Sequence, residues 1–356
     1  MSTCPTCGEP VAPDDQFCES CGATLADAAV PGAPPEPESG THTFLPPTQS
    51  IPAVTPPRQC DSCGGEVDTD GWCTVCGLRA ANERDHSTER VAPNVAAVCD
   101  KGLVHPRNED AVALAASHGR IVIVVSDGVT SSTDSDVASL AAARAARDVL
   151  DGSPPAPSRA PAALVEFWTD ALDRSVVAAQ EQAEAAAVTV GATDNPPSCT
   201  FVAAVVDGPV LVSGWVGDSR CYWFGDDDTA VQVSVDDSWA STQIARGTDR
   251  EVAEADPRAH AITRWLGVDA PTGRPTCASV PVGSGGWVLV CSDGLWNYCS
   301  PARDLGELLH HVIAEVGDDP RMVAGALCEW ANDQGGHDNV TVALARLPAT
   351  PPDDPA

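Results

Sequence analysis

Two stretches of the 356-residue chain decide its fold: GRIVIVVSDG at residues 119–128 and GWVLVCSDG at residues 286–294. Each is a short, Val-rich apolar run that ends in Ser-Asp-Gly, the pattern of a buried strand that stops at a turn. Three further stretches predict strands, at residues 200–208, 210–224 and 339–347. Apolar residues recurring every three to four positions predict helices, at residues 136–150, 164–187, 301–316 and 320–334. Because neighbouring strands are joined by short turns, we expect antiparallel sheets covered by helices, an α+β fold.

The composition excludes several classes of function. The chain has 20 Lys+Arg and 51 Asp+Glu, so its formal net charge is 20 − 51 = −31. This charge repels phosphate backbones and anionic lipids, which excludes non-specific binding to nucleic acid or to a membrane surface. No apolar stretch approaches the roughly 20 residues that span a bilayer, and the start of the chain lacks a signal pattern. We therefore expect a cytoplasmic protein.

Eight of the 15 cysteines form four Cys-x-x-Cys pairs near the N-terminus. The pairs are Cys4/Cys7, Cys18/Cys21, Cys60/Cys63 and Cys73/Cys76. Two such pairs present four thiolates in the tetrahedral arrangement that Zn²⁺ prefers, and the glycine after each second cysteine permits a tight turn. The spacing predicts two structural Zn²⁺ sites; redox-active pairs or an iron site are the open alternatives. The modules resemble zinc ribbons of the short double-ribbon type.

The cysteine modules and the composition divide the chain. We expect zinc ribbons at residues 1–25 and 58–79, a Pro-rich linker at 26–57, a short linker at 80–91, a large domain at 92–347 and a disordered tail at 348–356. Residues 1–78 contain one basic and eleven acidic side chains, too few cations to bind nucleic acid. The ribbons are therefore expected to dock a protein partner or to be purely structural.

Acidic residues stand at the ends of several predicted strands. Asp127 and Asp293 end the two decisive strands, and each is followed by glycine. Similar acids occur in RNED at 107–110, in GDSR at 217–220 and in GGHDNVTV at 335–342. One such site alone would be an ordinary turn, but several in a strongly acidic chain need compensating cations. Oxygen ligands without His or Cys favour Mg²⁺ or Mn²⁺ over Zn²⁺.

Eight motifs occur in the order of a known family. They are NEDAV, VVSDGV, SCTFVAAVV, GWVGDSRCYWF, VDDSWA, ITRWLG, LVCSDGLWNY and GGHDNVTV. This series resembles the metal-dependent protein phosphatases (PPM, type 2C). The resemblance implies two packed antiparallel β-sheets flanked by helices, an αββα sandwich. It also implies hydrolysis of phosphoserine or phosphothreonine by a water that two Mn²⁺ or Mg²⁺ ions activate, with a third cation optional.

The resemblance also implies the catalytic residues. Asp127 matches the carboxylate that bridges both cations, and Gly128 matches the residue that lends its carbonyl oxygen. Asp293 and Asp338 match the remaining direct ligands.

Other matched positions lie around these ligands. Glu109 and Asp110 match the acidic pair that holds water on the cations, with Asn339 beside them, and Asp218 matches a ligand of the optional third cation. Residues 237–262 take the place of the flap that contacts substrate.

The sequence departs from the family pattern at the phosphate-binding arginine. The family position falls on His105, whereas an arginine stands at Arg107. We expect Arg107 to bind the phosphate, because a guanidinium is charged at any relevant pH; His105 is the alternative. The usual glycines after Asp127 are missing, and the histidine that serves some members as acid would fall near Val129.

The sequence therefore predicts a Mg²⁺- or Mn²⁺-dependent Ser/Thr protein phosphatase with zinc-ribbon docking modules. Its expected partners are phosphorylated proteins, the products of a Ser/Thr kinase. The alternative is a catalytically silent scaffold that binds phosphoproteins. A zinc-ribbon nucleic-acid binder is a third reading, which the acidic composition disfavours.

Overall fold

The computed structural model describes residues 2–3, 10–11, 59–60, 62–68, 71–78, 80, 82–191, 194–271, 273–283 and 285–349. The chain divides into two units, Met1–Pro56 and Pro57–Ala356. In the first unit, the described residues form two short antiparallel strands, β1 (Ser2–Thr3) and β2 (Pro10–Val11). The cysteines of the first predicted ribbon lie outside the described residues: Cys4, Cys7, Cys18 and Cys21.

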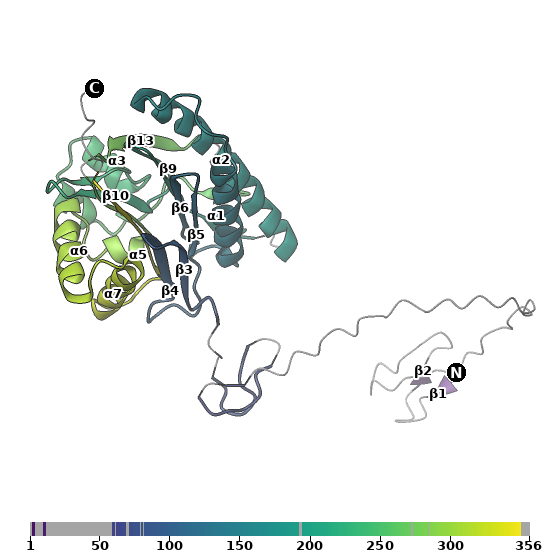
Figure 1. The fold of residues 1–356 in the computed structure, drawn as a ribbon. Helices are drawn as coiled ribbons and strands as arrows, with labels where there is room; N and C mark the ends of the chain where they lie inside the picture. The colour runs from purple at the N-terminus through teal and green to yellow at the C-terminus, as the bar shows by residue number, and fades with distance from the viewer. Residues whose placement is uncertain are drawn as a thin grey trace, which may run out of the picture. The chain divides into compact units, whose positions relative to one another are not determined.

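The second unit contains two large antiparallel sheets (Figure 1). The first has the strand order β11-β10-β14-β15-β4-β3. Its strands are β3 (His86–Ala92), β4 (Val95–Asp100), β10 (Arg220–Gly225), β11 (Ala230–Gln232), β14 (Gly286–Cys291) and β15 (Val340–Leu347).

The second large sheet has the order β13-β9-β8-β6-β5. Its strands are β5 (Ala111–Ser117), β6 (Arg120–Ser126), β8 (Phe201–Asp207), β9 (Val210–Val216) and β13 (Thr276–Pro281). A separate two-stranded sheet pairs β7 (Ser198–Cys199) with β12 (Leu266–Gly267).

Helices cover the outer face of each large sheet (Figure 1). The five-stranded sheet carries α1 (Ser135–Asp151) and α2 (Pro161–Val190), and the six-stranded sheet carries α6 (Ala302–Val316) and α7 (Pro320–Asp333). Three short helices complete the unit: α3 (Trp239–Ala245), α4 (Arg250–Glu254) and α5 (Asp293–Trp296). The predicted αββα sandwich is confirmed. No helix of the described residues combines the length and apolar character needed to cross a membrane.

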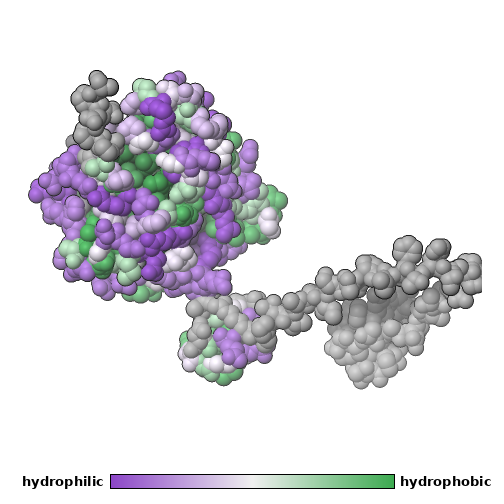
Figure 2. Space-filling model, viewed as in Figure 1, coloured by the Kyte–Doolittle hydropathy of each residue, from purple (hydrophilic) through white to green (hydrophobic). Residues whose placement is uncertain are grey.

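The alternation along β6 explains why its sequence is apolar without interruption. Val122 and Val124 pack under α1 and α2, whereas Ile123 and Val125 pack against the other sheet. Successive side chains of a strand point to opposite faces, so a strand covered on both sides must be apolar at every position. The core therefore has three layers, one between the sheets and one under each helix pair. On the face seen in Figure 2, hydrophobic residues gather in a hollow within a largely polar surface.

Two regions differ from the sequence prediction. Residues 210–224, predicted as one strand, form β9 and β10 in different sheets, because the chain turns at Gly217 with a φ of 111°. A Cβ at Gly217 would lie 2.8 Å from the Cβ of Thr200, so this turn needs glycine. Strand β3 begins at His86, inside the segment predicted as the 80–91 linker, so the sheet starts earlier than expected.

The strand register brings distant acids to one end of the sandwich. The end of β6 pairs with the start of β5, Ser126 opposite Ala111, so Asp127 and Asp110 leave the sheet together. The end of β14 pairs near the start of β15, Cys291 opposite Val342, so residues 293 and 338 leave the other sheet at the same end. The β9–β10 turn, which carries Asp218, also ends there, because Arg220 lies opposite Cys291.

Candidate active site and zinc module

Acidic side chains line a cavity at this end of the sandwich. The cavity has a volume of about 340 Å³. Its lining includes five of the residues predicted to hold divalent cations: Asp127, Gly128, Asp218, Asp293 and Asp338. Asp218 is 4% exposed, whereas Asp127, Asp293 and Asp338 are partly open to the cavity. Thus the structure brings together acids that lie up to 211 positions apart, from 127 to 338.

The carboxylates are close enough to perturb one another. Burial raises the pKa of Asp127 well above its usual value, and the charges of Asp110, Asp293, Asp338 and Asp218 add to the effect. Burial, together with the charges of Asp338 and Asp110, also raises the pKa of Asp293 to about 7. The raised pKa values show that few positive groups of the protein compensate these carboxylates. Bound cations would supply the missing positive charge.

Two carboxylate oxygens in the cluster are buried without a hydrogen-bond partner. The Oδ2 of Asp110 accepts hydrogen bonds of 2.7 Å from the hydroxyls of Ser292 and Thr341, but its Oδ1 has none. The Oδ2 of Asp293 accepts a bond of 3.0 Å from Asn297, and its Oδ1 also has none. Buried oxygens are rarely left unpaired, so these two are suited to hard cations or to water held by them.

The Asn339 side chain holds the loop that carries the acidic pair. Its Oδ1 accepts a hydrogen bond from the Glu109 N–H at 2.7 Å, and its Nδ2 donates to the carbonyls of Lys101 and Arg107 at 2.7 and 3.0 Å. Both amide hydrogens are thus used on backbone groups. The geometry gives Asn339 a positioning role for Glu109, and its expected place among the metal-binding residues stays a prediction.

Gly128 permits a close approach between two of these loops. A Cβ at this position would lie 2.8 Å from the Glu109 carbonyl oxygen and 2.9 Å from the Cβ of Ser135. The adjacent Asp127 carbonyl accepts a hydrogen bond of 2.7 Å from the Thr200 N–H, and the Asp127 N–H donates to the Thr200 hydroxyl at 3.0 Å. The backbone that carries Asp127 and Gly128 is therefore fixed on both sides.

A buried ion pair supports the loop of Asp218. The Trp296 Nε1–H donates to the Asp218 carbonyl at 3.0 Å, and the Arg220 guanidinium stacks 3.5 Å from the centre of the Trp296 ring. Arg220 also forms a two-point ion pair with Asp236, at 2.8 and 2.6 Å. Burial raises the pKa of Asp218, and the charge of Asp293 contributes.

The two candidate phosphate contacts, Arg107 and His105, lie next to the acids rather than in the cavity lining. Arg107 donates to Glu109 at 3.0 Å and to Asp134 at 2.9 Å. The Nε2 of His105 lies 3.4 Å from the Oδ1 of Asp338. Arg107 is thus held beside the predicted metal site by acids, and the choice between the two residues stays open.

Several residues of the site were not singled out from the sequence. Ser292 and Thr341 hold Asp110, Thr200 holds Asp127, and His260 lines the cavity. Ser292 and Thr341 stand inside the motifs LVCSDGLWNY and GGHDNVTV, but a hydroxyl at the end of a strand is too common to be chosen by itself. His260 belongs to the segment predicted as the flap, and that segment contains α3 and α4.

The four cysteines of the second predicted ribbon converge. The ligand atoms of Cys60, Cys63, Cys73 and Cys76 all lie within 4.8 Å of one another. Backbone N–H groups of Val75 and Cys76 point at the Cys73 sulfur, at 3.4 and 3.5 Å. These bonds, that of Cys76 first, lower the pKa of Cys73 to about 6, which favours the thiolate that binds Zn²⁺. The donor set and its spacing fit one structural zinc ion.

The turns of this module have the geometry that the sequence predicts. The glycines that follow each pair, Gly64 and Gly77, have φ values of 72° and 70°. No other group of three His, Cys, Asp or Glu in the described part of the chain has its ligand atoms this close together. The acids of the cavity do not form such a tight group.

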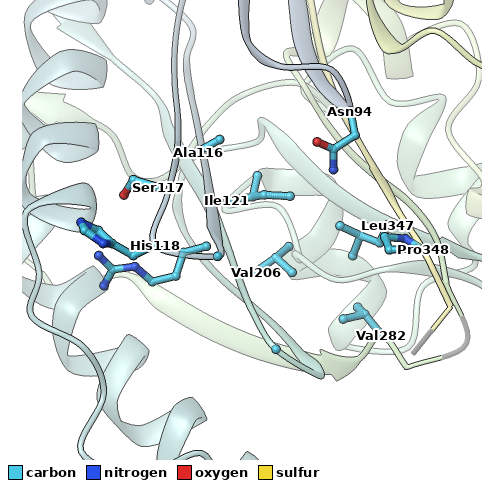
Figure 3. Close-up of a pocket in the computed structure, with 12 residues that line it drawn as sticks. Asn94, Ala116, Ser117, His118, Ile121, Val206, Val282, Leu347 and Pro348 are labelled. Carbon is cyan, nitrogen blue, oxygen red and sulfur yellow. The ribbon is translucent and has the colours of Figure 1, made fainter. Parts of the chain in front are cut away.

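A second cavity lies at the opposite, hairpin end of the sandwich (Figure 3). It has a volume of about 420 Å³ and opens between the β5–β6 and β8–β9 hairpins. Ile121, Val206, Val282 and Leu347 point into it (Figure 3). No acidic residue is among the residues that line it. It therefore offers no carboxylate ligand to a divalent cation.

Comparison with known proteins identifies the family. Residues 105–330 match the model of protein phosphatase 2C, and residues 4–77 match the model of the double zinc ribbon. No curated protein matches the chain. The solved structure of the Mycobacterium tuberculosis serine/threonine phosphatase PstP/Ppp is similar, with 30% identity and a TM-score of 0.57. That match covers 71% of this chain and 97% of the other.

Two further solved structures resemble the chain. One is the catalytic domain of PstP in complex with two manganese ions, with 27% identity, a TM-score of 0.54 and coverage of 71% of this chain and 97% of that one. The other is the PPM Ser-Thr phosphatase MsPP of Mycobacterium smegmatis in complex with cacodylate, with 26% identity, a TM-score of 0.54 and coverage of 73% and 100%. The resemblance seen in the sequence motifs is confirmed: this chain belongs to the protein phosphatase 2C family.

Proposed function

We propose that this chain hydrolyses phosphoserine and phosphothreonine residues of proteins, and that it requires Mn²⁺ or Mg²⁺. The observation that carries the proposal is the acid-lined cavity, where the buried Oδ1 of Asp293 has no hydrogen-bond partner. The Oδ1 of the neighbouring Asp110, outside the lining, is buried without a partner as well. Such a cluster is costly unless cations occupy it. The manganese ions in the PstP structure support the same choice of metal.

The proposed metal ligands are the side chains of Asp127, Asp293 and Asp338 and the carbonyl of Gly128. These residues would hold two divalent cations, which would supply a water of lowered pKa and offset negative charge on the reacting phosphate. Glu109 and Asp110 are proposed to order water around the site. Asp218 is proposed as a ligand of a third cation.

The chain's own residues fix the position of the site and of the substrate. Thr200 accepts a hydrogen bond from the Asp127 N–H, and the hydroxyls of Ser292 and Thr341 donate to Asp110. The carboxylates of these acids therefore need little rearrangement when cations bind. Arg107 is proposed to bind the substrate phosphate, with His105 as the alternative. Thr130, Ser131 and His260 also line the cavity.

We propose that the zinc ribbons dock protein partners and thereby raise the concentration of phosphorylated substrates near the cavity. The substrates would be proteins phosphorylated by a Ser/Thr kinase. The acidic character of residues 1–78 supports a protein partner over nucleic acid, because few cations are available to contact phosphates.

The test is hydrolysis of p-nitrophenyl phosphate with and without Mn²⁺, by the wild type and by Asp293→Asn. We expect metal-dependent turnover in the wild type and its loss in the variant, with zinc content unchanged. If the wild type shows no turnover at any Mn²⁺ concentration, the proposal is wrong. The alternative, a silent scaffold that binds phosphoproteins, would then account for the family fold.

A further inference from the structure

The cavity that holds the acids continues into a groove on the surface of the same unit. A neighbouring cavity of about 220 Å³, here called the middle cavity, shares three lining residues with it: Val129, Ser131 and Ile262. A third cavity of about 230 Å³, the outer cavity, shares Trp265 with the middle cavity. The three cavities therefore follow one another from the carboxylates to α2, and Trp265 lies between the middle cavity and the outer cavity.

The outer cavity is suited to an apolar side chain. One wall is a face of α2, where Val176, Val177 and Gln180 recur at helical spacing. The opposite wall contains Trp265 and Pro271. Val177 is 58% exposed. Covering its side chain with an apolar group would therefore be favourable. An occupant with a Leu-sized or Phe-sized side chain would cover it.

The walls of the groove are held in place without a ligand. The side chain of Gln180 donates to the Gly267 carbonyl at 2.7 Å and accepts from the Gly267 N–H at 3.0 Å, which ties the segment after Trp265 to α2. In the middle cavity, the Val129 N–H donates to the Ser198 carbonyl at 2.9 Å. A preformed groove costs little conformational entropy when it binds an extended peptide.

The charges of the groove have one sign. Glu181 and Glu184 line the outer cavity and Asp269 lines the middle cavity, whereas no Lys, Arg or His lines either. A phosphate group itself would be repelled here. A segment with basic residues beside an apolar one is complementary to these walls.

We propose that this groove binds the polypeptide that flanks the phosphorylated residue of the substrate. An apolar side chain occupies the outer cavity, and basic residues lie along Glu181, Glu184 and Asp269. The proposal rests on the proposed function, because the phosphorylated residue must reach the carboxylates. It adds a substrate class: phosphoproteins with an apolar anchor and a basic stretch near the phosphorylation site.

The experiment uses the full chain and a set of phosphothreonine peptides. In one series a single leucine is moved, position by position, away from the phosphothreonine in an otherwise polar peptide. In a second series, flanking lysines are exchanged for glutamates. The variants are Val177→Asp and Glu181→Lys, and the matched control is Val188→Asp, an 80% exposed valine of α2 that lines none of the three cavities.

We expect one leucine position to raise kcat/KM of the wild type about tenfold, the selectivity that an apolar pocket gives. Val177→Asp should abolish this preference through KM, and Glu181→Lys should reduce the preference for lysines. Val188→Asp should behave as the wild type, and p-nitrophenyl phosphate should be hydrolysed equally by all four proteins. If Val177→Asp and Val188→Asp treat every peptide alike, the groove does not bind substrate.

A binding measurement separates this proposal from the proposed function. Fluorescence anisotropy of labelled peptides with the Asp293→Asn protein measures peptide binding in the groove without turnover. If the wild type hydrolyses nothing, yet leucine-dependent binding is lost in Val177→Asp, the groove stands and the proposed catalysis fails. If hydrolysis occurs but binding shows neither a leucine nor a lysine preference, the groove is overturned and the catalysis stands.

Discussion

The two candidate metal sites of this chain are built in opposite ways. In the second cysteine module the outermost ligands, Cys60 and Cys76, are 16 positions apart. Beside the acid-lined cavity, the hydrogen bond from Thr341 to Asp110 joins residues 231 positions apart. The first site is local and needs little besides its turns. The second exists only after both sheets have formed.

This difference assigns a different energetic role to each metal. The cysteine module has a core of only four residues: Cys60, Val67, Cys73 and Ala80. This core is too small to fold without metal, so the free energy of zinc binding drives the folding of the module. The αββα sandwich has three large apolar layers and is expected to fold without cations. In the sandwich, repulsion between the acids lowers the free energy of unfolding. The apolar core offsets this loss, and bound cations would reduce the repulsion.

The largest expected effect is the loss of catalysis in Asp127→Asn. Asp127 is proposed to bridge both cations, so we expect the rate on p-nitrophenyl phosphate at saturating Mn²⁺ to fall by more than about 100-fold. Zinc content should not change. The matched control is Asp228→Asn, an exposed acid of a turn outside the cavity, which should keep full activity. Equal loss in both variants would contradict the assignment.

The converse change is Cys73→Ser in the local site. Because Cys73 contributes a thiolate favoured by backbone N–H groups, its removal should release about one zinc ion per chain. Hydrolysis of p-nitrophenyl phosphate should stay within about twofold of wild type, since the sandwich has its own core. Cys277→Ser, at a single half-buried cysteine, is the control and should keep all its zinc. Metal analysis measures the zinc content, and initial rates measure the activity. If Cys73→Ser loses activity together with its zinc, the two sites are not independent.

A smaller effect is expected when a residue that holds an acid is changed. Thr341→Val removes one of the two hydroxyls on Asp110 and preserves side-chain volume. We expect the Mn²⁺ concentration for half-maximal activity to rise by about 10–100-fold, with the maximal rate less affected. Thr189→Val, whose hydroxyl bonds only the backbone of α2, is the control. An unchanged metal requirement would mean that Asp110 does not depend on this bond.

The phosphate contact is tested by comparing Arg107→Ala with His105→Ala. If Arg107 binds the phosphate, its removal should raise KM for p-nitrophenyl phosphate about tenfold, the cost of one charge-assisted contact. His105→Ala should raise KM less. The opposite order would assign the contact to His105, the family's usual position.

The smallest expected effect is on the pH dependence of folding stability. Burial raises the pKa of Asp293 to about 7 and that of Asp110 to about 6, above the usual 3.8. Between about pH 4 and pH 7, the metal-free folded protein therefore keeps protons that the unfolded chain has lost. Raising the pH through this window lowers the free energy of unfolding. The Tm of metal-free protein should fall by a few degrees, and Mn²⁺ should abolish the fall; a Tm that rises in the absence of metal would contradict this.

The sequence predicted the local features best. The helices and the strands that end in Asp127 and Asp293 follow from periodicity and Val-rich runs, and they were found close to their observed bounds. Strand β5 (Ala111–Ser117) was missed, because its sequence AVALAAS has little β propensity and it forms by pairing with β6. The break between β9 and β10 at Gly217 depends on the close approach of this turn to Thr200, which no local pattern reveals.

The candidate site was predictable only in part, and for the same reason. The cysteine spacing alone predicted the group that Cys60, Cys63, Cys73 and Cys76 form. The acids at the strand ends predicted a site for Mg²⁺ or Mn²⁺, but the role of each acid came only from the resemblance to family motifs. Their shared cavity depends on the register of two sheets. The bonds of Ser292 and Thr341 to Asp110, 182 and 231 positions away, could not be read from the chain.

The most direct measurement of the central claim is anomalous diffraction at the manganese edge from crystals of the full chain soaked in Mn²⁺. We expect two peaks about 3.5–4 Å apart, between the carboxylates of Asp127, Asp293 and Asp338. An absence of manganese at these three residues, in crystals whose cavity is open to solvent, would contradict the account.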